Sequence, residues 1–178
     1  KENEDLPTLE NLPIAPPPTL LNQIPISAEL ELLPAMRFVR SSPNYLGFLQ
    51  FFIENTTRLL VAFSDTTRDN DNPFRIIVPE MAMHSLTLMK IVVAFGAQHK
   101  HQLTNPTEAD DGVSRLLVRE AVWELVDNMD NMDKLDDQGR ELTLASILML
   151  AGYSIFFGGG RTKWSIHLSG ARDILKSM

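Results

Sequence analysis

The stretch LTLMKIVVAFGAQH, residues 86–99, decides the fold of this chain. Apolar side chains occupy a wide arc of the helix that it would form, so we expect that helix to be largely buried. Ser85 stands directly before it, where a helix N-cap is favoured. Upstream, Asn72 and Pro73 predict the start of a shorter helix, which Pro79 cuts. The sequence therefore predicts two successive helices, the second of them inside the protein.

Helical periodicity continues on both sides of this stretch. Ser42 and Pro43 predict the start of a helix through residues 45–63, which is roughly five turns long. On the other side, an amphipathic helix is expected from Thr107 to about Met129, with a capping-type start. Both segments place apolar residues on one face, as helices that pack on a core do.

The segment ELTLASILMLAGYSIFF, residues 141–157, is nearly apolar all round. Its seventeen residues fall short of a membrane span, so we expect a central helix of a bundle. Three glycines end it, and Thr162 predicts the start of a last helix. Because no segment shows a convincing alternation of period two, the predicted fold class is all-α, an antiparallel multi-helix bundle or helical array.

Eight of the eleven prolines fall between Pro7 and Pro43, where they disfavour regular helix and central strand. Residues 1–40 are therefore predicted to be a proline-rich linker whose C-terminal part docks on the bundle. Residues 41–178 are predicted to form the helical domain, as the N-terminal part of a larger one. We expect the chain to be a fragment of a longer protein.

The composition excludes several classes of function. The chain has 23 acidic and 16 basic side chains and a formal charge of -7, which repels phosphate backbones, so direct nucleic-acid binding is not expected. It contains no cysteine, which excludes disulfides, thiolate zinc sites and cysteine nucleophiles. No apolar run is long enough to suggest a membrane protein.

Several constellations resemble binding motifs, but each has a better structural interpretation. Asp69, Asp71 and Glu80 fit a calcium loop only in part, because proline and phenylalanine occupy the positions of a ligand and of the turn glycine. The sequence GGGRTK, residues 158–163, offers backbone amides to an anion, but a helix stop followed by a turn explains it better. The acidic run in residues 127–137 is interpreted as a solvated loop.

The histidines and serines do not indicate catalysis. His84, His99 and His101 have no carboxylate at a recognised metal-ligand spacing. No serine occupies a strained nucleophile elbow. We therefore predict no metal site, no catalytic residue and no enzymatic activity.

The last helix carries a pattern that is typical of helix packing. Trp164, Leu168, Ala171 and Leu175 are spaced by four, three and four residues, which predicts one apolar seam. Gly170, beside Ala171, is expected to let another helix come close. The imidazole of His167 is expected to hydrogen-bond to a neighbouring loop.

The pattern W-x-x-H-L-x-G-A-x-x-I-L in residues 164–175 resembles the regulatory (middle-homology) domain found downstream of the DNA-binding module in fungal zinc-cluster transcription factors, the fungal-specific transcription factor domain. Three other segments are similar to it in the same order, so the resemblance covers residues 30–178. They are FLQFFIENTTRLL (48–60), NPFRIIVPEMAMHSLTLMKIVVAFGAQHK (72–100) and ELTLASILMLAGYSIFFGG (141–159). The motif residues expected to have structural roles are Asn72, Pro73, Phe74, Trp164, His167, Leu168, Gly170 and Ala171.

The resemblance implies a nuclear regulatory domain that controls a transcription factor through a ligand, a partner or self-association. Its implied partners are the remainder of the same factor, a second copy or a coregulator, and a small apolar effector. Zinc is implied only for a six-cysteine module upstream, so no cofactor is expected in this chain. The family's domain typically runs beyond Met178, and an incomplete bundle would expose apolar surface.

Four methionines, Met81, Met83, Met89 and Met149, are candidate walls of an effector cavity, since their side chains adapt to irregular shapes. The alternative is that they are ordinary core residues. A different function also stays open: a ligand-free helical scaffold for protein interaction or dimerisation. A helical enzyme is the third possibility, and it would need a polar cluster inside the bundle.

Overall fold

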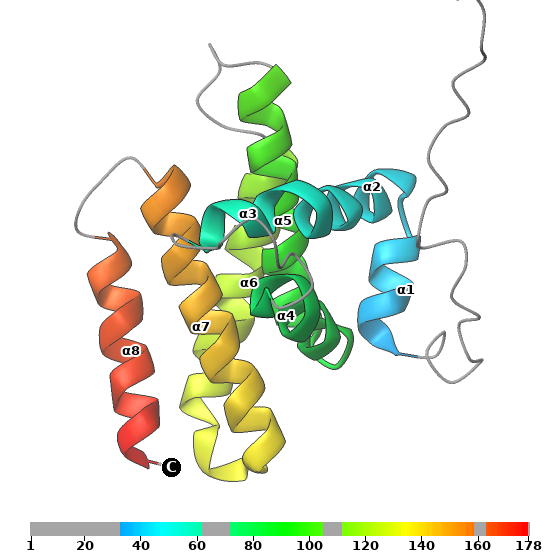
Figure 1. Cartoon of the computed structure of the whole chain (residues 1–178). Coiled ribbons are helices and arrows are strands. Elements are labelled where there is room, and N and C mark those ends of the chain that lie inside the picture. The colour runs from blue at the N-terminus through cyan, green and yellow to red at the C-terminus, as the bar shows by residue number, and fades with distance from the viewer. Residues whose placement is uncertain (1–32, 62–71, 105–111, 159–162, 178) are drawn as a thin grey trace, which may run out of the picture.

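The computed structural model describes residues 33–61, 72–104, 112–158 and 163–177, and all regular secondary structure in these ranges is helical (Figure 1). The helices are α1 (Pro34–Arg40), α2 (Pro43–Phe51), α3 (Thr57–Leu60), α4 (Pro73–Met83), α5 (Leu86–Thr104), α6 (Gly112–Asp130), α7 (Asp137–Phe157) and α8 (Lys163–Ser177). A π-helical segment, Phe52–Thr56, joins α2 to α3, and a 3-10 turn, Met132–Lys134, precedes α7. The prediction of an all-α fold is confirmed.

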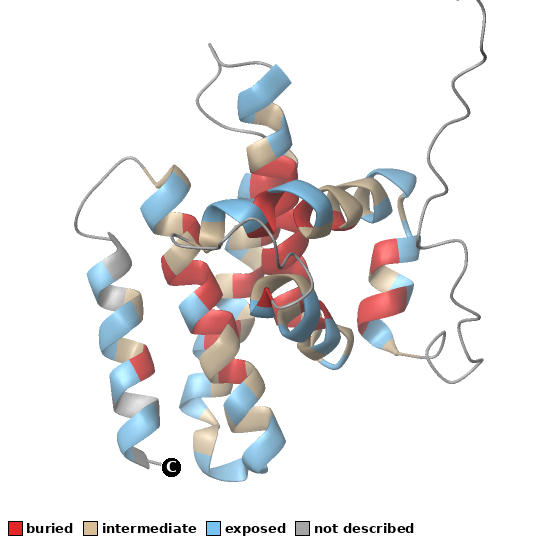
Figure 2. Cartoon of the chain, in the orientation of Figure 1, coloured by how far each residue is buried: buried red, intermediate tan, exposed pale blue. Residues whose placement is uncertain are grey.

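Helix α5 lies at the centre of the molecule. Residues 87–98 are all buried, as Figure 2 shows, and the helix contacts α2, α4, α6 and α7. Ser85 caps it, because its Oγ accepts a hydrogen bond from the backbone N–H of Leu88 at 3.2 Å. The predicted burial and N-cap are therefore confirmed, although α7, which we expected at the centre, packs on one side of α5.

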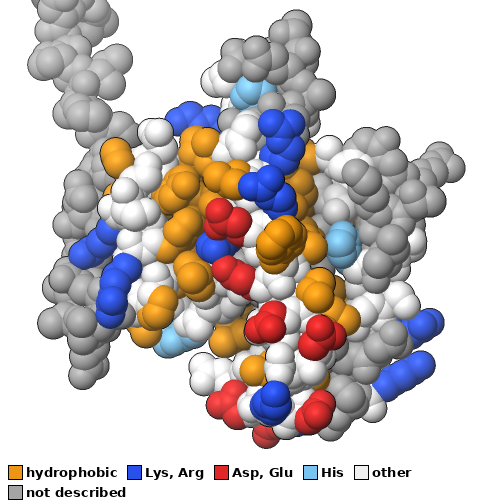
Figure 3. Space-filling view, turned by 180° about the vertical axis from the view of Figure 1, so that it is seen from behind, with side chains coloured by type: hydrophobic (Ala, Val, Ile, Leu, Met, Phe, Trp, Pro, Cys, Tyr) orange, Lys and Arg blue, Asp and Glu red, His pale blue; other side chains and the backbone are white. Residues whose placement is uncertain are grey.

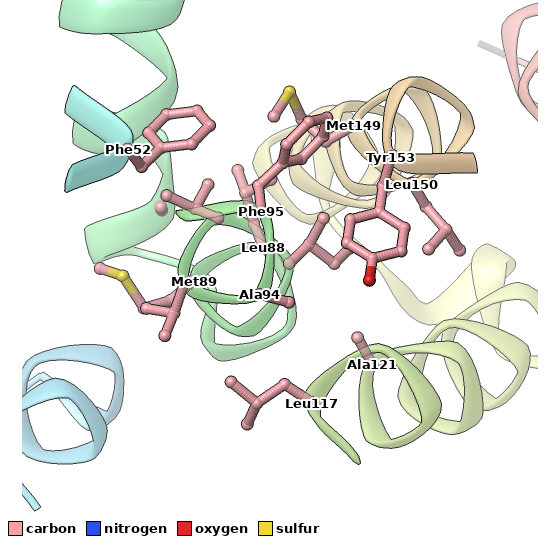
Figure 4. Packing of buried hydrophobic residues seen from close by; sticks show 14 of the residues in the cluster. Phe52, Leu88, Met89, Ala94, Phe95, Leu117, Ala121, Met149, Leu150 and Tyr153 are labelled. Carbon is pink, nitrogen blue, oxygen red and sulfur yellow. The ribbon is translucent and has the colours of Figure 1, made fainter. Parts of the chain in front are cut away.

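Aromatic side chains join three of these elements around Phe95 of α5. The ring centroid of Phe95 lies 6.0 Å from that of Phe52 in the π-helical segment and 5.4 Å from that of Tyr153 in α7. Phe157 adds a third ring at 5.3 Å from Phe95. All three pairs meet edge to face, which is a favourable geometry for aromatic rings. Figure 4 shows Phe95 between Phe52 and Tyr153.

The helix predicted over residues 45–63 differs from a regular α-helix in its second half. It passes through the π-helical segment and ends at Leu60. The backbone N–H of Thr57 donates to the carbonyl of Phe52 instead of that of Ile53. The hydroxyl of Thr57 donates to the carbonyl of Ile53 at 3.0 Å. A threonine side chain thus satisfies the carbonyl group that the wider turn leaves without its usual partner.

Two expectations drawn from prolines are wrong. Pro79 lies inside α4, which continues to Met83, and it is buried. Residues 34–40, which we assigned to the part of the linker that docks on the bundle, form α1, and its buried Ala35, Met36 and Val39 belong to the core cluster. Pro34 is at its first turn, where a missing N–H removes no helical hydrogen bond. Residues 1–32 lie outside the described part of the structure, so the boundary at residue 40 stays a prediction.

Helix α7 is longer than expected. It has 21 residues and is long and apolar enough to cross a membrane by length and composition alone, which corrects our expectation that it is too short. The core helix of a soluble protein passes the same test. In the structure, α7 contacts α5 and α8 extensively, and its buried residues include Ile147, Leu150 and Tyr153. In its most apolar 18-residue stretch 39% is buried, so α7 packs on the core along one face.

Candidate functional site

An apolar cavity of about 210 Å³ lies between α6, α7 and α8. Residues on α6 form one wall at helical spacing, two residues of α7 form the floor, and α8 lines a further side, so the cavity is partly open to solvent. The described residues that line the cavity are Val122, Leu125, Val126, Met129, Ile147, Leu150, His167 and Gly170. Apart from one imidazole, the side chains in this set are aliphatic or carry a thioether, so the cavity suits a hydrocarbon-rich occupant.

His167 is the one titratable residue among those described at the cavity. It is half-buried, and burial lowers the pKa of its imidazole below 6.5. The neutral form is therefore favoured at neutral pH, and it presents one donor and one acceptor nitrogen. The hydrogen bond that we expected from His167 to a neighbouring loop is not made with any residue that the structure describes.

The predicted seam on α8 is wrong for two of its residues. Ala171 is buried, but Leu168 is 40% exposed and Leu175 is 58% exposed. The described inner face of α8 comprises His167, Gly170 and Ala171, so Ala171 is the one described member of the predicted seam that lies on it. The side chain of Trp164 lies outside the described part of the structure.

Gly170 does not provide a close approach of two helices. A β-carbon built at Gly170 would meet the terminal methyl of Met129 at 3.6 Å, which is an ordinary contact. The close approach occurs instead at Gly96 of α5, where a β-carbon would overlap the backbone carbonyl of Phe48 in α2. Gly96 was not among the residues that we expected to have a structural role. A lone glycine inside a buried helical run was the available signal.

The motif Asn72-Pro73-Phe74 joins two helices. The Oδ1 atom of Asn72 accepts a hydrogen bond from the N–H of Phe74 at 2.9 Å and so caps α4, as predicted. Its Nδ2 atom donates to the carbonyl of Thr57 in α3 at 3.1 Å. The side chain is buried. Both halves of its amide are thus satisfied, which an aspartate or serine could not reproduce.

The four candidate methionines do not lie together. Met89 is buried in α5 and Met149 in α7, and Figure 4 shows them on different sides of α5. Met81 borders a second, more polar pocket of about 420 Å³ between α4 and α7, and Met83 is half-buried. Met129, which we had not selected, is the methionine at the apolar cavity. A ligand role for the selected four stays a prediction.

Polar groups between α5 and α6 form a closed network. Lys90 Nζ lies 2.6 Å from Glu124 and 2.9 Å from Glu120, and the hydroxyl of Thr87 donates to Glu124 at 2.7 Å. Burial lowers the pKa of Lys90, but its hydrogen bonds to Glu124 and Glu120 outweigh this effect and raise the pKa above 10.5. These groups satisfy one another, so their arrangement is that of a structural network.

Metal binding has little support in the described ranges, where no group of three His, Asp or Glu residues is placed to hold an ion. Asp69 and Asp71 of the calcium-loop interpretation lie outside the described residues, as do Thr107, Thr162 and most of the GGGRTK segment. The zinc cluster that the resemblance associates with DNA binding needs six cysteines, and this chain has none.

Comparison with known proteins gives one match. The family model described as "Fungal specific transcription factor domain" matches residues 47–178, which is most of the chain. No curated protein and no solved structure matches significantly. The match covers all of the helices that surround α5 except α1 and the first turn of α2, and it includes the three helices that form the apolar cavity. The chain therefore belongs to the family of fungal specific transcription factor domains.

Proposed function

We propose that this chain is the effector-responsive regulatory domain of a nuclear transcription factor, and that the effector is a small apolar or amphipathic molecule bound between α6, α7 and α8. Family membership supports the regulatory role in a transcription factor. The observation that carries the effector part is the cavity, whose described walls are apolar except for one imidazole.

The size of the cavity sets the size of the effector. An apolar cavity of roughly 150 Å³ can hold benzene, so a cavity of about 210 Å³ suits a somewhat larger molecule. Removing about 200 Å² of ligand surface from water contributes about 5 kcal/mol to binding. The neutral imidazole of His167 offers a hydrogen bond to one hydroxyl, carbonyl or ether group of the ligand.

Binding at this place gives a physical route to regulation. Helix α8 contacts α7 extensively, while the cavity separates its inner face from α6. An occupant would fill this space and connect α8 to both neighbours. A ligand that binds this arrangement more tightly than any alternative position of α8 shifts the population toward it. The position of α8 would then be the signal that the rest of the transcription factor detects.

A matched pair of variants on α8 tests the proposal. Gly170→Leu places a side chain in the cavity, whereas Ser169→Leu places the same side chain at the exposed neighbouring position. With 1-octanol as the probe, the melting temperature of the wild type and of Ser169→Leu should rise, and that of Gly170→Leu should not. An equal rise in all three proteins would place the binding elsewhere and contradict the proposal.

The same pair tests regulation in the full-length factor. In a reporter assay, Gly170→Leu should fix transcriptional output at one level irrespective of the inducing condition, because the filled cavity no longer responds. Ser169→Leu should retain the wild-type response. A wild-type response in Gly170→Leu would show that the cavity does not control activity.

The ligand-free scaffold is the second candidate function, and one observation favours it. Trp123 on α6 is 74% exposed, although tryptophan is enriched at the centres of protein interfaces. A scaffold would self-associate without an effector, and the probe would leave the melting temperature of every variant unchanged.

A further inference from the structure

The outward face of α6 carries a row of residues that are not part of the buried core. We call it the outer seam, and it comprises Leu116, Arg119, Trp123, Val126 and Asp130. Leu116 is 39% exposed, Trp123 74% and Val126 54%. Figure 3, seen from behind, shows this side of the molecule, where hydrophobic side chains lie among acidic and basic ones. The inward face of α6 buries a different set, namely Ser114, Leu117, Ala121 and Leu125.

The spacing of the outer seam places its members on one face of α6, as a contact between two helices requires. Its members follow at intervals of three, four, three and four residues, which is the alternation of a and d positions in a heptad. Exposed apolar residues scattered singly would need no explanation. A row at this spacing, centred on an exposed tryptophan, indicates a partner helix.

The charges along α6 identify an antiparallel partner. Arg119 lies in its N-terminal half, whereas the exposed carboxylates Asp127 and Asp130 lie at its C-terminal end. This order opposes the dipole of the helix, which favours acidic residues at the start and basic residues at the end. A second α6 running in the opposite direction would bring the basic half of each helix beside the acidic half of the other.

Two carboxylates beside the seam are already compensated. Lys90 of α5 contacts both Glu120 and Glu124. When a second copy approaches, the negative charge of Glu120 and Glu124 in each copy is therefore already balanced in part by Lys90 of the same copy. The apolar and basic residues of the seam are left to make the contact.

We propose that this domain self-associates through the outer seam, with α6 of two copies antiparallel about a two-fold axis. In this register Leu116 faces Val126 of the second copy, and Arg119 faces Trp123 of the second copy. Asp130 lies near the start of the opposite helix at Gly112, where a carboxylate is favourable. Each contact occurs twice, as a two-fold interface requires. The guanidinium of Arg119 over the indole adds a cation–π contact on both sides.

The first experiment measures the mass of the 178-residue chain in solution by sedimentation. The wild type should be a dimer, whereas Trp123→Ser and Arg119→Glu should be largely monomeric with unchanged helical circular dichroism. Ile155→Ser is the matched control, because Ile155 is 59% exposed on α7 and lies outside the seam. It should remain dimeric. A monomeric wild type, or a dimer that persists in Trp123→Ser, would overturn the proposal.

The second experiment tests direction and register. Since the chain has no cysteine, a single introduced cysteine reports one contact. Mixing Leu116→Cys with Val126→Cys under mild oxidation should give mainly the mixed disulfide. In the proposed register, two copies of position 116 are separated by ten residues along the helix axis, or about 15 Å. Dominant disulfides between identical positions would indicate parallel helices and refute the proposal.

Self-association does not require the proposed effector. Gly170→Leu, which fills the cavity, should leave the dimer intact. In Gly170→Leu, both proposals expect an intact dimer that no longer responds to 1-octanol. A wild-type chain that is monomeric but responds normally to 1-octanol would refute only the dimer.

Discussion

Gly96 of α5 lies against the backbone carbonyl of Phe48 in α2, so closely that a β-carbon at position 96 would overlap the carbonyl oxygen. The same β-carbon would lie 3.2 Å from the backbone nitrogen of Phe52, where the π-helical segment begins. The obstacles are backbone atoms, which cannot rotate away as a side chain can. Gly96 is therefore what allows α2 to cross α5 at this distance.

Gly96→Ala should destabilise the domain by about 1–3 kcal/mol, since the added methyl forces α2 away from α5. Gly47→Ala is the control, because a β-carbon there meets nothing within 4 Å. It should be neutral or stabilising by up to about 1 kcal/mol, as alanine favours helix. Urea denaturation measures both free energies of unfolding. Equal free energies of unfolding for the two variants would show that α2 can move away from α5 without loss of stability.

Asn72→Ala should lower the free energy of unfolding by about 2 kcal/mol, because it removes the cap of α4 and the hydrogen bond to Thr57. Asn72→Asp should not restore stability, since its second oxygen would face the carbonyl of Thr57. Ser42→Ala removes the exposed cap of α2, in which the N–H of Asn44 donates to Ser42 Oγ at 3.3 Å. It should lower the free energy of unfolding by less than Asn72→Ala. A fully stable Asn72→Asp would mean that the bond to Thr57 contributes nothing.

Lys90→Met should cost about 1–3 kcal/mol, since the carboxylates of Glu120 and Glu124 lose a charged hydrogen-bond donor. The raised pKa of Lys90 means that its contribution is fully present below pH 10.5 and is lost only as the pH rises above that value. Adding Glu124→Gln to Lys90→Met should recover part of the loss. A double-mutant cycle at neutral pH measures the coupling, and additive losses would show that the ion pair is unimportant.

The stability of the domain should decrease as the pH falls below 6.5, because burial lowers the pKa of both His99 and His167. Between the folded and unfolded pKa values, the unfolded chain binds more protons, so acidification favours unfolding. His99→Gln and His167→Gln should each flatten this dependence. Urea titrations between pH 5 and pH 8 measure it. A pH dependence that persists unchanged in the double variant would assign it to other groups.

Much of the fold could be predicted because the signals were local. Ser85, Asn72 and Gly158 mark helix ends by chemistry that acts within a few residues. The burial of α5 follows from its nearly continuous apolar sequence. Pro34 and Pro79 misled the prediction because proline is tolerated in the first turn of a helix and in a packed position, and only the tertiary structure shows which case applies.

The site was less predictable because it depends on which faces of three helices meet. The spacing of Leu168 and Leu175 indicates a seam, but spacing alone does not say which side of α8 turns inward. Met129 and His167 are brought together by the packing of α6 and α8, which lie far apart in sequence. The exposure of Trp123 likewise follows from the orientation of α6 on α5.

Val126 borders the apolar cavity and is also a member of the outer seam. An effector that displaces this side chain would change the affinity between two copies of the domain. Thermodynamic reciprocity then requires that pairing change the affinity for the effector by the same factor. Through Val126, the effector concentration needed to switch the transcription factor would thus depend on how much of that factor the cell contains.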